Sequence, residues 1–201
     1  MSCSVYERVL GEELDRLPAL LRAGFTGEAA IGVGDGVFAS AGCTRRLLRP
    51  LLRVLARQRV LFPEFGTHVP FRIVNTPTAD GGLHAVRTFR FPSGDRLLED
   101  TLRVVDGHLH DVMGRRGGFE VRMLVAVEGE RLLMRSERQW LHLGPLRLRL
   151  PRLAGVTVTE SVVGGRRSID VRLRSPLLGE WFHYAGQFDY AVGGPSGEAT
   201  T

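Results

Sequence analysis

Apolar and polar residues alternate along most of the chain between residues 71 and 190. The clearest segments are 169–174 and 181–190, where every second side chain suits a dry face. This period of two is typical of half-buried antiparallel strands, because successive side chains point to opposite faces of the sheet. The pattern predicts about ten strands, near residues 69–75, 83–91, 96–105, 108–113, 119–127, 131–141, 146–150, 156–163, 167–174 and 180–191.

Short turn sequences such as Asp106-Gly107 and Gly164-Gly165 separate these segments. Short connections favour an antiparallel meander, and about ten strands in one domain curl into a barrel or stack as a sandwich. We therefore predict a mainly β fold, an antiparallel barrel or strongly curved sheet. Such a fold can enclose a ligand.

Two N-terminal helices are predicted to pack on the barrel or plug it. Ser4 and Glu7 have the spacing of a capping box, and Pro18 ends or kinks the first helix. The second helix spans residues 44–58 and is interrupted by Pro50. The apolar face of the first helix consists of Tyr6, Leu10, Leu14 and Leu17.

The second helix has a leucine face and an arginine face. We expect the leucines to plug one end of the barrel while the arginines face water; the alternative is docking on a membrane or an acidic partner. The two faces are Leu47, Leu48, Leu51 and Leu55, and Arg46, Arg49, Arg53 and Arg57.

A glycine-rich segment at residues 32–36 lies before the second helix. It lacks the full pattern of a phosphate-binding loop, and no helix pattern follows it directly. We predict a turn between short strands at residues 28–33 and 37–40.

The composition is that of an ordinary globular protein. The chain has 201 residues, 43% of them hydrophobic and 24% charged. We expect a single barrel-like domain over residues 1–192 and a flexible tail over 193–201. No apolar run approaches the ~20 residues of a membrane span, and the start does not resemble a secretory signal. A cytoplasmic protein without an integral membrane segment is predicted.

The basic residues are all arginine, 27 in number, and the net charge is +5. Without lysine, Schiff-base catalysis and a phosphate-loop lysine are excluded. The arginines alternate with apolar residues along strands, which is typical of a solvated sheet face, so nucleic acid is not an expected partner.

Metal and cofactor chemistry are not expected. Cys3 and Cys43 do not have metal-ligand spacing. His108 and His110 share one face of a strand, but the glutamate that should follow them closely is missing, and Glu120 is distant in the sequence.

Two charged residues stand on faces that should be apolar. Glu160 follows Val156 and Val158 at a spacing of two, and Arg87 shares a face with Phe89 and Phe91. If both faces point inward, the two form a buried ion pair that stabilises the register, or they line a pocket as catalytic groups, with Glu160 as a general acid or base.

The last strand offers aromatic residues to a ligand. Trp181 and His183 lie on one face of it, whereas Tyr184 belongs to the opposite, aromatic face. Trp140 shares a face with His142 on an earlier strand. We predict that Trp140, Trp181, His183 and Tyr184 bind the substrate, because core and ligand cavity coincide in a barrel of this size.

The chain as a whole resembles a bacterial domain family of unknown function that is often fused to saccharopine-dehydrogenase-like Rossmann proteins. This chain departs from the family pattern in lacking that partner and in having Ala85 where a tryptophan is usual. The resemblance implies a stand-alone member recruited to a biosynthetic pathway, and it brings no known reaction or cofactor. It is carried by Tyr6-Glu-Arg-Val-Leu-Gly11, Arg87-Thr-Phe89, Trp140 with Leu143-Gly-Pro-Leu146, Leu150-Pro151, Glu160, Ser175-Pro-Leu-Leu-Gly179 and Tyr184-Ala-Gly186.

These observations lead to one main hypothesis and two alternatives. The main hypothesis is a barrel that holds a hydrophobic biosynthetic intermediate and acts as a cyclase or isomerase by positioning it in an enclosed pocket. The second is a non-catalytic carrier of a lipid-like ligand, and the third, ranked last, is a nucleic-acid binder. The oligomeric state is not determined by the sequence, and a homodimer is one of the alternatives.

Overall fold

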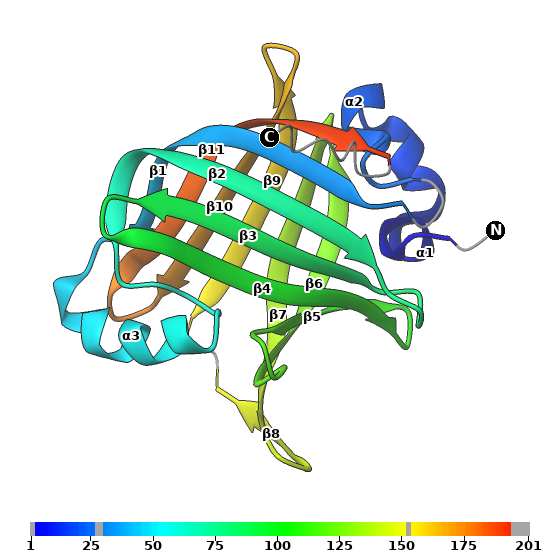
Figure 1. The fold of residues 1–201 in the computed structure, drawn as a ribbon. Helices are drawn as coiled ribbons and strands as arrows, with labels where there is room; N and C mark the ends of the chain where they lie inside the picture. The colour runs from blue at the N-terminus through cyan, green and yellow to red at the C-terminus, as the bar shows by residue number, and fades with distance from the viewer. Residues whose placement is uncertain (1–2, 27–29, 152–153, 194–201) are drawn as a thin grey trace, which may run out of the picture.

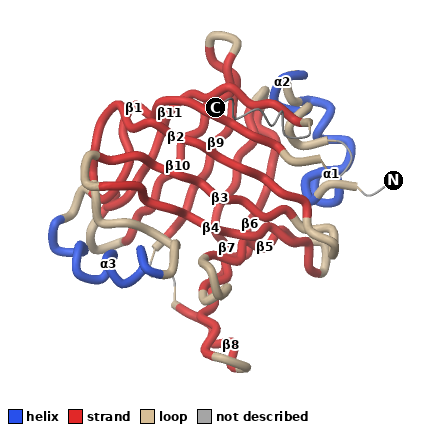
Figure 2. The backbone as a smooth tube through the Cα atoms, in the orientation of Figure 1, coloured by secondary structure: helices blue, strands red, loops and turns tan. Residues whose placement is uncertain are grey.

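The computed structural model describes residues 3–26, 30–151 and 154–193, and most of these residues lie in strands (Figure 2). The strands are β1 (Gly32–Cys43), β2 (Phe65–Pro77), β3 (Leu83–Phe91), β4 (Gly94–Val105), β5 (His108–Met113), β6 (Phe119–Glu128), β7 (Arg131–Leu143), β8 (Leu146–Leu150), β9 (Gly155–Val163), β10 (Arg166–Ser175) and β11 (Gly179–Val192). The helices are α1 (Val5–Leu10), α2 (Ala19–Arg22) and α3 (Arg49–Arg57), with 3₁₀ segments η1 (Gly11–Arg16) and η2 (Arg46–Leu48).

Ten of the described strands close into one antiparallel barrel (Figure 1). The strands follow the order β6-β5-β4-β3-β2-β1-β11-β10-β9-β7, and pairing between β6 and β7 joins the two ends. The first part of β7 pairs with β9, whereas its last part, from Gln139 to Leu143, pairs with the extra strand β8. The predicted barrel of about ten strands with two N-terminal helical regions is confirmed.

Each of the ten strands predicted from the alternation is present. The predicted bounds of β3, β5 and β8 are those of the structure, and the largest difference is at β2, which begins at Phe65 instead of residue 69. Period-two patterning bounded by turn residues therefore locates these strands well, because both signals are local.

The prediction of a turn at residues 32–36 is wrong. A single strand, β1, runs through this segment and pairs with β2 and β11 on its two sides. The glycines are required by close packing: a Cβ on Gly36 would lie 2.2 Å from the main-chain oxygen of Gln187 and 2.7 Å from the Cα of Phe188. The predicted start at residue 28 lies outside the described residues.

The N-terminal helices cover one end of the barrel, with α1 against β4, β5 and β6. The predicted capping box is present, since the Glu7 amide donates to Ser4 Oγ at 3.1 Å and the Ser4 amide donates to Glu7 Oε2 at 2.7 Å. The first helix is shorter than predicted, because η1 continues it as a 3₁₀ segment before Pro18. All four residues of the predicted apolar face, Tyr6, Leu10, Leu14 and Leu17, are buried.

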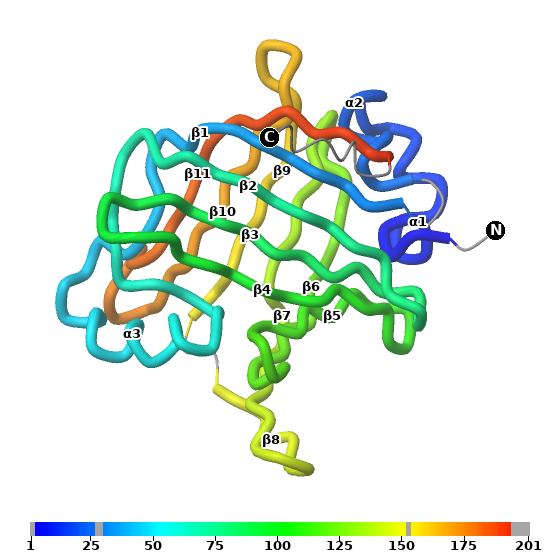
Figure 3. Tube along the Cα trace, viewed as in Figure 1, coloured from blue at the N-terminus to red at the C-terminus, as the bar shows by residue number. Residues whose placement is uncertain are grey.

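Helix α3 lies at the end of the barrel that is away from α1 and α2 (Figure 3). Pro50 stands in its first turn, where a missing N–H costs nothing, so it begins α3 instead of interrupting a longer helix. The predicted leucine plug is only partly present: Leu48 and Leu55 pack against the core, whereas Leu47 is 82% exposed. None of the described helices is long and apolar enough to span a lipid bilayer.

The barrel interior holds two apolar clusters. An aromatic cluster lies on the α3 side, where Phe38 stacks on Phe71 with ring centroids 4.1 Å apart and Phe62 meets Phe89 at 5.0 Å. A mainly aliphatic cluster joins the N-terminal helices to β4, β5, β6 and β7. Between them the core is not filled by side chains.

Candidate functional site inside the barrel

The barrel encloses a cavity of about 350 Å³. Tyr6 of α1 contributes to its wall, as do Leu51 and Leu55 of α3. Because Leu51 is also 57% exposed, the cavity reaches the surface beside α3. The apolar part of the wall includes Leu98, Leu102, Met113, Val121, Met123, Met134, Val156, Val158, Ile169 and Val171.

Three charged side chains interrupt this wall in the middle of β3, β4 and β5. They are Arg87, Asp100 and Asp111. Arg87 donates a hydrogen bond to Asp100 Oδ1, and the Asp100 side chain is only 5% exposed. Nε of Arg87, Oδ2 of Asp100 and Oδ1 of Asp111 are buried and have no hydrogen-bond partner among the residues that the structure describes. Buried polar atoms of this kind cost free energy until something bonds to them, which makes this the part of the wall suited to a ligand's polar group.

The protonation states of the wall follow from burial. Burial and the charge of Asp100 raise the pKa of the Asp111 carboxyl well above its usual value, although Arg87 acts in the opposite direction. Burial raises the pKa of Tyr184 to about 12 and also raises the pKa of Tyr6. Burial therefore favours the protonated form of the Asp111 carboxyl and keeps the two phenols protonated, and all three are hydrogen-bond donors in that form.

The two charged residues singled out by the alternation do face inward. Glu160 lies on the wall with Val156 and Val158, and Arg87 lies on it beside the buried Phe89. The inward orientation of both predicted faces is thus confirmed.

The predicted ion pair between Arg87 and Glu160 is wrong, because each has another partner. Glu160 Oε2 accepts a hydrogen bond from Arg167 at 2.7 Å, and both side chains are buried. The Arg167 guanidinium also lies 4.8 Å from the ring centroid of Phe25. In the closed ring four strands separate β3 from β9, so each charge is paired with a residue on an adjacent strand, Asp100 on β4 and Arg167 on β10.

The last strand, β11, turns its aromatic face inward. Phe182 is fully buried and Tyr184 lines the cavity. Trp181 lines it as well, at the beginning of the strand, where a register shift interrupts the pairing with β10. His183 does not: its Nε2 lies 2.9 Å from Ser40 Oγ. The structure thus brings Trp181 and Tyr184 to the cavity and leaves His183 outside it.

Trp140 does not line the cavity but belongs to a polar cluster on β5, β6, β7 and β8, of which Glu120 reaches the cavity wall. Its ring stacks on His110 at 5.8 Å, and the Arg147 guanidinium lies 4.1 Å from the ring centroid. Glu120 accepts hydrogen bonds from His110 and His142, each at 2.6 Å, and from Arg147 at 2.7 Å. Burial alone raises the pKa of Glu120, but these hydrogen bonds outweigh it and lower the pKa to about 2.

This cluster corrects one step of the sequence argument about metals. His110 contacts Glu120, which we judged too distant in the sequence, because pairing of β5 with β6 brings them together. His108 points elsewhere, its Nδ1 lying 2.8 Å from the carbonyl oxygen of Asp106. In the part of the chain that the structure describes, no group of three His, Cys, Asp or Glu side chains is placed to hold a metal ion.

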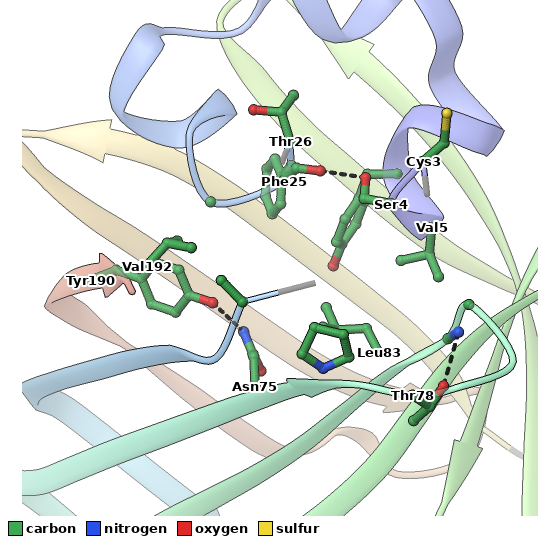
Figure 4. Close-up of a pocket in the computed structure, with 16 residues that line it drawn as sticks. Cys3, Ser4, Val5, Phe25, Thr26, Asn75, Thr78, Leu83, Tyr190 and Val192 are labelled. Carbon is green, nitrogen blue, oxygen red and sulfur yellow. Dashed lines mark hydrogen bonds between the residues drawn. The ribbon is translucent and has the colours of Figure 1, made fainter. Parts of the chain in front are cut away.

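A second, smaller hollow of about 80 Å³ lies beside the N-terminal helices (Figure 4). Asn75 donates to the Tyr190 hydroxyl there at 2.8 Å, and the Gly82 amide donates to Thr78 Oγ1 at 2.9 Å. A space of this size holds at most a few water molecules, so the 350 Å³ cavity is the better candidate site.

Four carboxylates on the cavity wall are not among the residues selected from the sequence: Glu99, Asp100, Asp111 and Glu120. Asp100 stands between Leu98 and Leu102 at a spacing of two, and Asp111 stands between Leu109 and Met113 in the same way. The rule that selected Glu160, a charge on an apolar face, also selects these two carboxylates when it is applied to β4 and β5.

The fold and cavity define a closed antiparallel barrel with an internal space for a small molecule. The family model described as "Domain of unknown function (DUF4166)" matches residues 17–188, so the chain belongs to this family. Comparison with curated proteins and with solved structures gives no match. The function must therefore be argued from the cavity.

Proposed function

We propose that this barrel binds a hydrophobic small molecule in its cavity and acts on it as a cyclase or isomerase of a biosynthetic pathway. The observation that carries the proposal is the cavity itself, about 350 Å³ in volume and mostly apolar. Small-molecule sites typically have volumes of roughly 300–1,000 Å³, with a few polar groups on an apolar wall.

Catalysis in such a site rests on shape and exclusion of water. A flexible substrate held in a reactive conformation can gain several orders of magnitude in rate by positioning alone. In this proposal Arg87 and Glu160 are the catalytic groups on the wall, while Trp181 and Tyr184 hold the hydrocarbon part. In this proposal Glu160, which accepts a hydrogen bond from Arg167, acts as the general acid or base.

A cavity-filling substitution tests the proposal. Val158→Phe places a larger side chain in the cavity, whereas Val163→Phe on the same strand replaces a side chain that is 47% exposed. With the uncharged fluorophore N-phenyl-1-naphthylamine as ligand, we expect Val158→Phe to weaken binding at least tenfold and Val163→Phe to leave it unchanged. Equal binding by all three proteins would place the fluorophore outside the cavity.

Cyclase or isomerase activity can be tested by the mass of the product. A cyclisation or isomerisation needs no oxidant or second substrate, so the product has the mass of its precursor. Extracts of source cells incubated with the native protein should show, by chromatography and mass spectrometry, one compound replaced by an isomer. The Val158→Phe protein should not make this conversion.

A second candidate function, a carrier of a lipid-like ligand, is favoured by the surface beside the cavity mouth. Helix α3 and strand β8 project from the same end of the barrel (Figure 1), and Leu51 of the former and Leu150 of the latter both line the cavity. Exposed leucines and arginines alternate on this end, a combination that suits an anionic lipid surface. The exposed leucines are Leu47, Leu51, Leu143, Leu146, Leu148 and Leu177.

Charge reversal distinguishes the carrier from the enzyme. The double variant Arg49→Glu/Arg53→Glu alters α3, and Arg90→Glu/Arg131→Glu changes the net charge equally elsewhere on the barrel. For a carrier, sedimentation with vesicles of phosphatidylcholine and phosphatidylglycerol should decrease at least fivefold for the first variant only. Equal losses in both variants, or no sedimentation of the native protein, would contradict the carrier function.

A further inference from the structure

On β3, β4 and β5 the cavity wall contains buried polar atoms that have no hydrogen-bond partner among the described residues. Asp100 Oδ2 has no hydrogen-bond partner although its side chain is 95% removed from solvent, and Asp111 Oδ1 and Arg87 Nε nearby are also unpartnered. These atoms belong to three adjacent strands and line one cavity. A protonated Asp111 and Arg87 Nε can both donate to one acceptor oxygen of a ligand, whereas Asp100 Oδ2 can only accept from a donor.

Apart from Asp111, each charged side chain of the wall has an ion-pair partner. Arg87 is paired with Asp100 and Glu160 with Arg167, and the two other carboxylates on the wall, Glu99 and Glu120, are paired with Arg59 and Arg147. Asp111 has no cation of its own, and the groups that act on it are Asp100 on β4 and Arg87 on β3, with Tyr184 of β11 also within electrostatic reach. Because burial and the neighbouring charge of Asp100 both disfavour its ionised form, they raise the pKa of Asp111 and favour the protonated form with its O–H group.

We propose that the cavity selects an uncharged, largely hydrocarbon molecule with an acceptor oxygen, and that Asp111 donates a hydrogen bond to this oxygen. The inference rests on the proposed function, because it concerns the same cavity. A charged ligand is disfavoured, since its charge would have no counterion in an apolar space whose own charges are paired.

Three bicyclic probes of similar size test this assignment: the ketone 2-acetylnaphthalene, the hydrocarbon 2-ethylnaphthalene and the anion 2-naphthoate. The native protein should bind the ketone more tightly than the anion. Asp111→Leu should weaken ketone binding about tenfold, the worth of one buried hydrogen bond, and leave hydrocarbon binding at least as strong. The control Asp95→Leu, which replaces an exposed aspartate, should change neither affinity.

A second variant separates the hydrogen bond from a packing effect. Asp111→Asn keeps a donor that does not titrate. In the native protein, ketone affinity should fall as pH rises through the raised pKa of Asp111, because the donated proton is lost. In Asp111→Asn the affinity should be independent of pH over the same range. The infrared stretch of the bound carbonyl should lie at lower frequency in these two proteins than in Asp111→Leu.

The possible results separate this inference from the proposed function. An unchanged ketone-to-hydrocarbon affinity ratio in Asp111→Leu, or the same pH dependence in Asp111→Asn and the native protein, would overturn the role of Asp111 while the cavity remains a binding site. Tighter binding of 2-naphthoate would overturn the selection for uncharged ligands. Failure of all three probes to bind would refute the binding function itself.

Discussion

At the scale of single residues, this protein tolerates buried charge by pairing it locally. Arg87 with Asp100 and Arg167 with Glu160 are pairs on adjacent strands, so each charge that leaves water finds a partner close by. Such pairs contribute little net stability, since desolvation offsets their attraction, but removing one partner is costly. Asp111 is the exception, because burial and the charge of Asp100 raise its pKa and so favour its protonated form.

Glu120 is a residue whose charge should stabilise the fold. Its pKa is about 2 in the folded protein against an ordinary value of 4.5, so the stabilisation is complete above pH 4.5 and is lost as pH falls toward 2. We expect Glu120→Gln to lower the free energy of unfolding by about 2 kcal/mol at pH 7, measured by urea denaturation. The difference should shrink below pH 4.5.

The control for this experiment is Glu128→Gln, because Glu128 is 61% exposed and lies 3.9 Å from Arg135. Exposed pairs contribute little, so this variant should be within about 0.5 kcal/mol of the native protein. A Glu120→Gln protein with native stability at pH 7 would show that its hydrogen bonds with His110, His142 and Arg147 contribute no net stability.

At the scale of elements, β1 shows how a misleading local signal arises. Its glycines at residues 32–36 are typical of a turn, yet they lie in a continuous strand. The reason is tertiary: the main chain of β11 and the rings of Phe188 and Tyr190 occupy the space that side chains on β1 would need. Glycine inside a strand often marks such a close approach.

Gly36→Ala should therefore destabilise the barrel. The added Cβ would meet the main-chain oxygen of Gln187 at 2.2 Å, and a backbone atom cannot move aside as a flexible side chain can. We expect a loss of about 2 kcal/mol, seen as a lower midpoint of thermal unfolding.

Gly155→Ala is the control, since Gly155 is likewise a strand glycine, but its nearest neighbour is a carbonyl oxygen 3.8 Å from the added Cβ. This variant should be as stable as the native protein or slightly more stable. If Gly36→Ala proves equally harmless, β1 can shift away from β11, and the packing explanation for its glycines fails.

At the scale of the whole molecule, closure of the ring decides which residues meet. Pairing of β6 with β7 joins the two ends of the strand order and turns one face of every strand inward. The interior is too wide to be filled by side chains from ten strands, and the helices cover its ends without filling it. The cavity is a consequence of this geometry.

Much of the fold and part of the site could be predicted from local pattern. The strands, the capping box and the inward faces of Glu160 and Arg87 follow from periodicity and short-range chemistry. The exclusion of Trp140 and His183 from the cavity could not be predicted in this way. Alternation shows which residues of a strand share a face, but it does not show which face is inside.

The alternation of apolar and polar residues thus specifies strands and their two faces, because side-chain direction in a strand depends only on position along it. The partners of the buried charges, the need for glycine in β1 and the existence of a cavity depend on the order of strands around the ring. That order brings together residues far apart in the sequence, such as Phe38 and Tyr184. Asp111 beside Asp100 and Arg87 exists as a site only in the closed barrel.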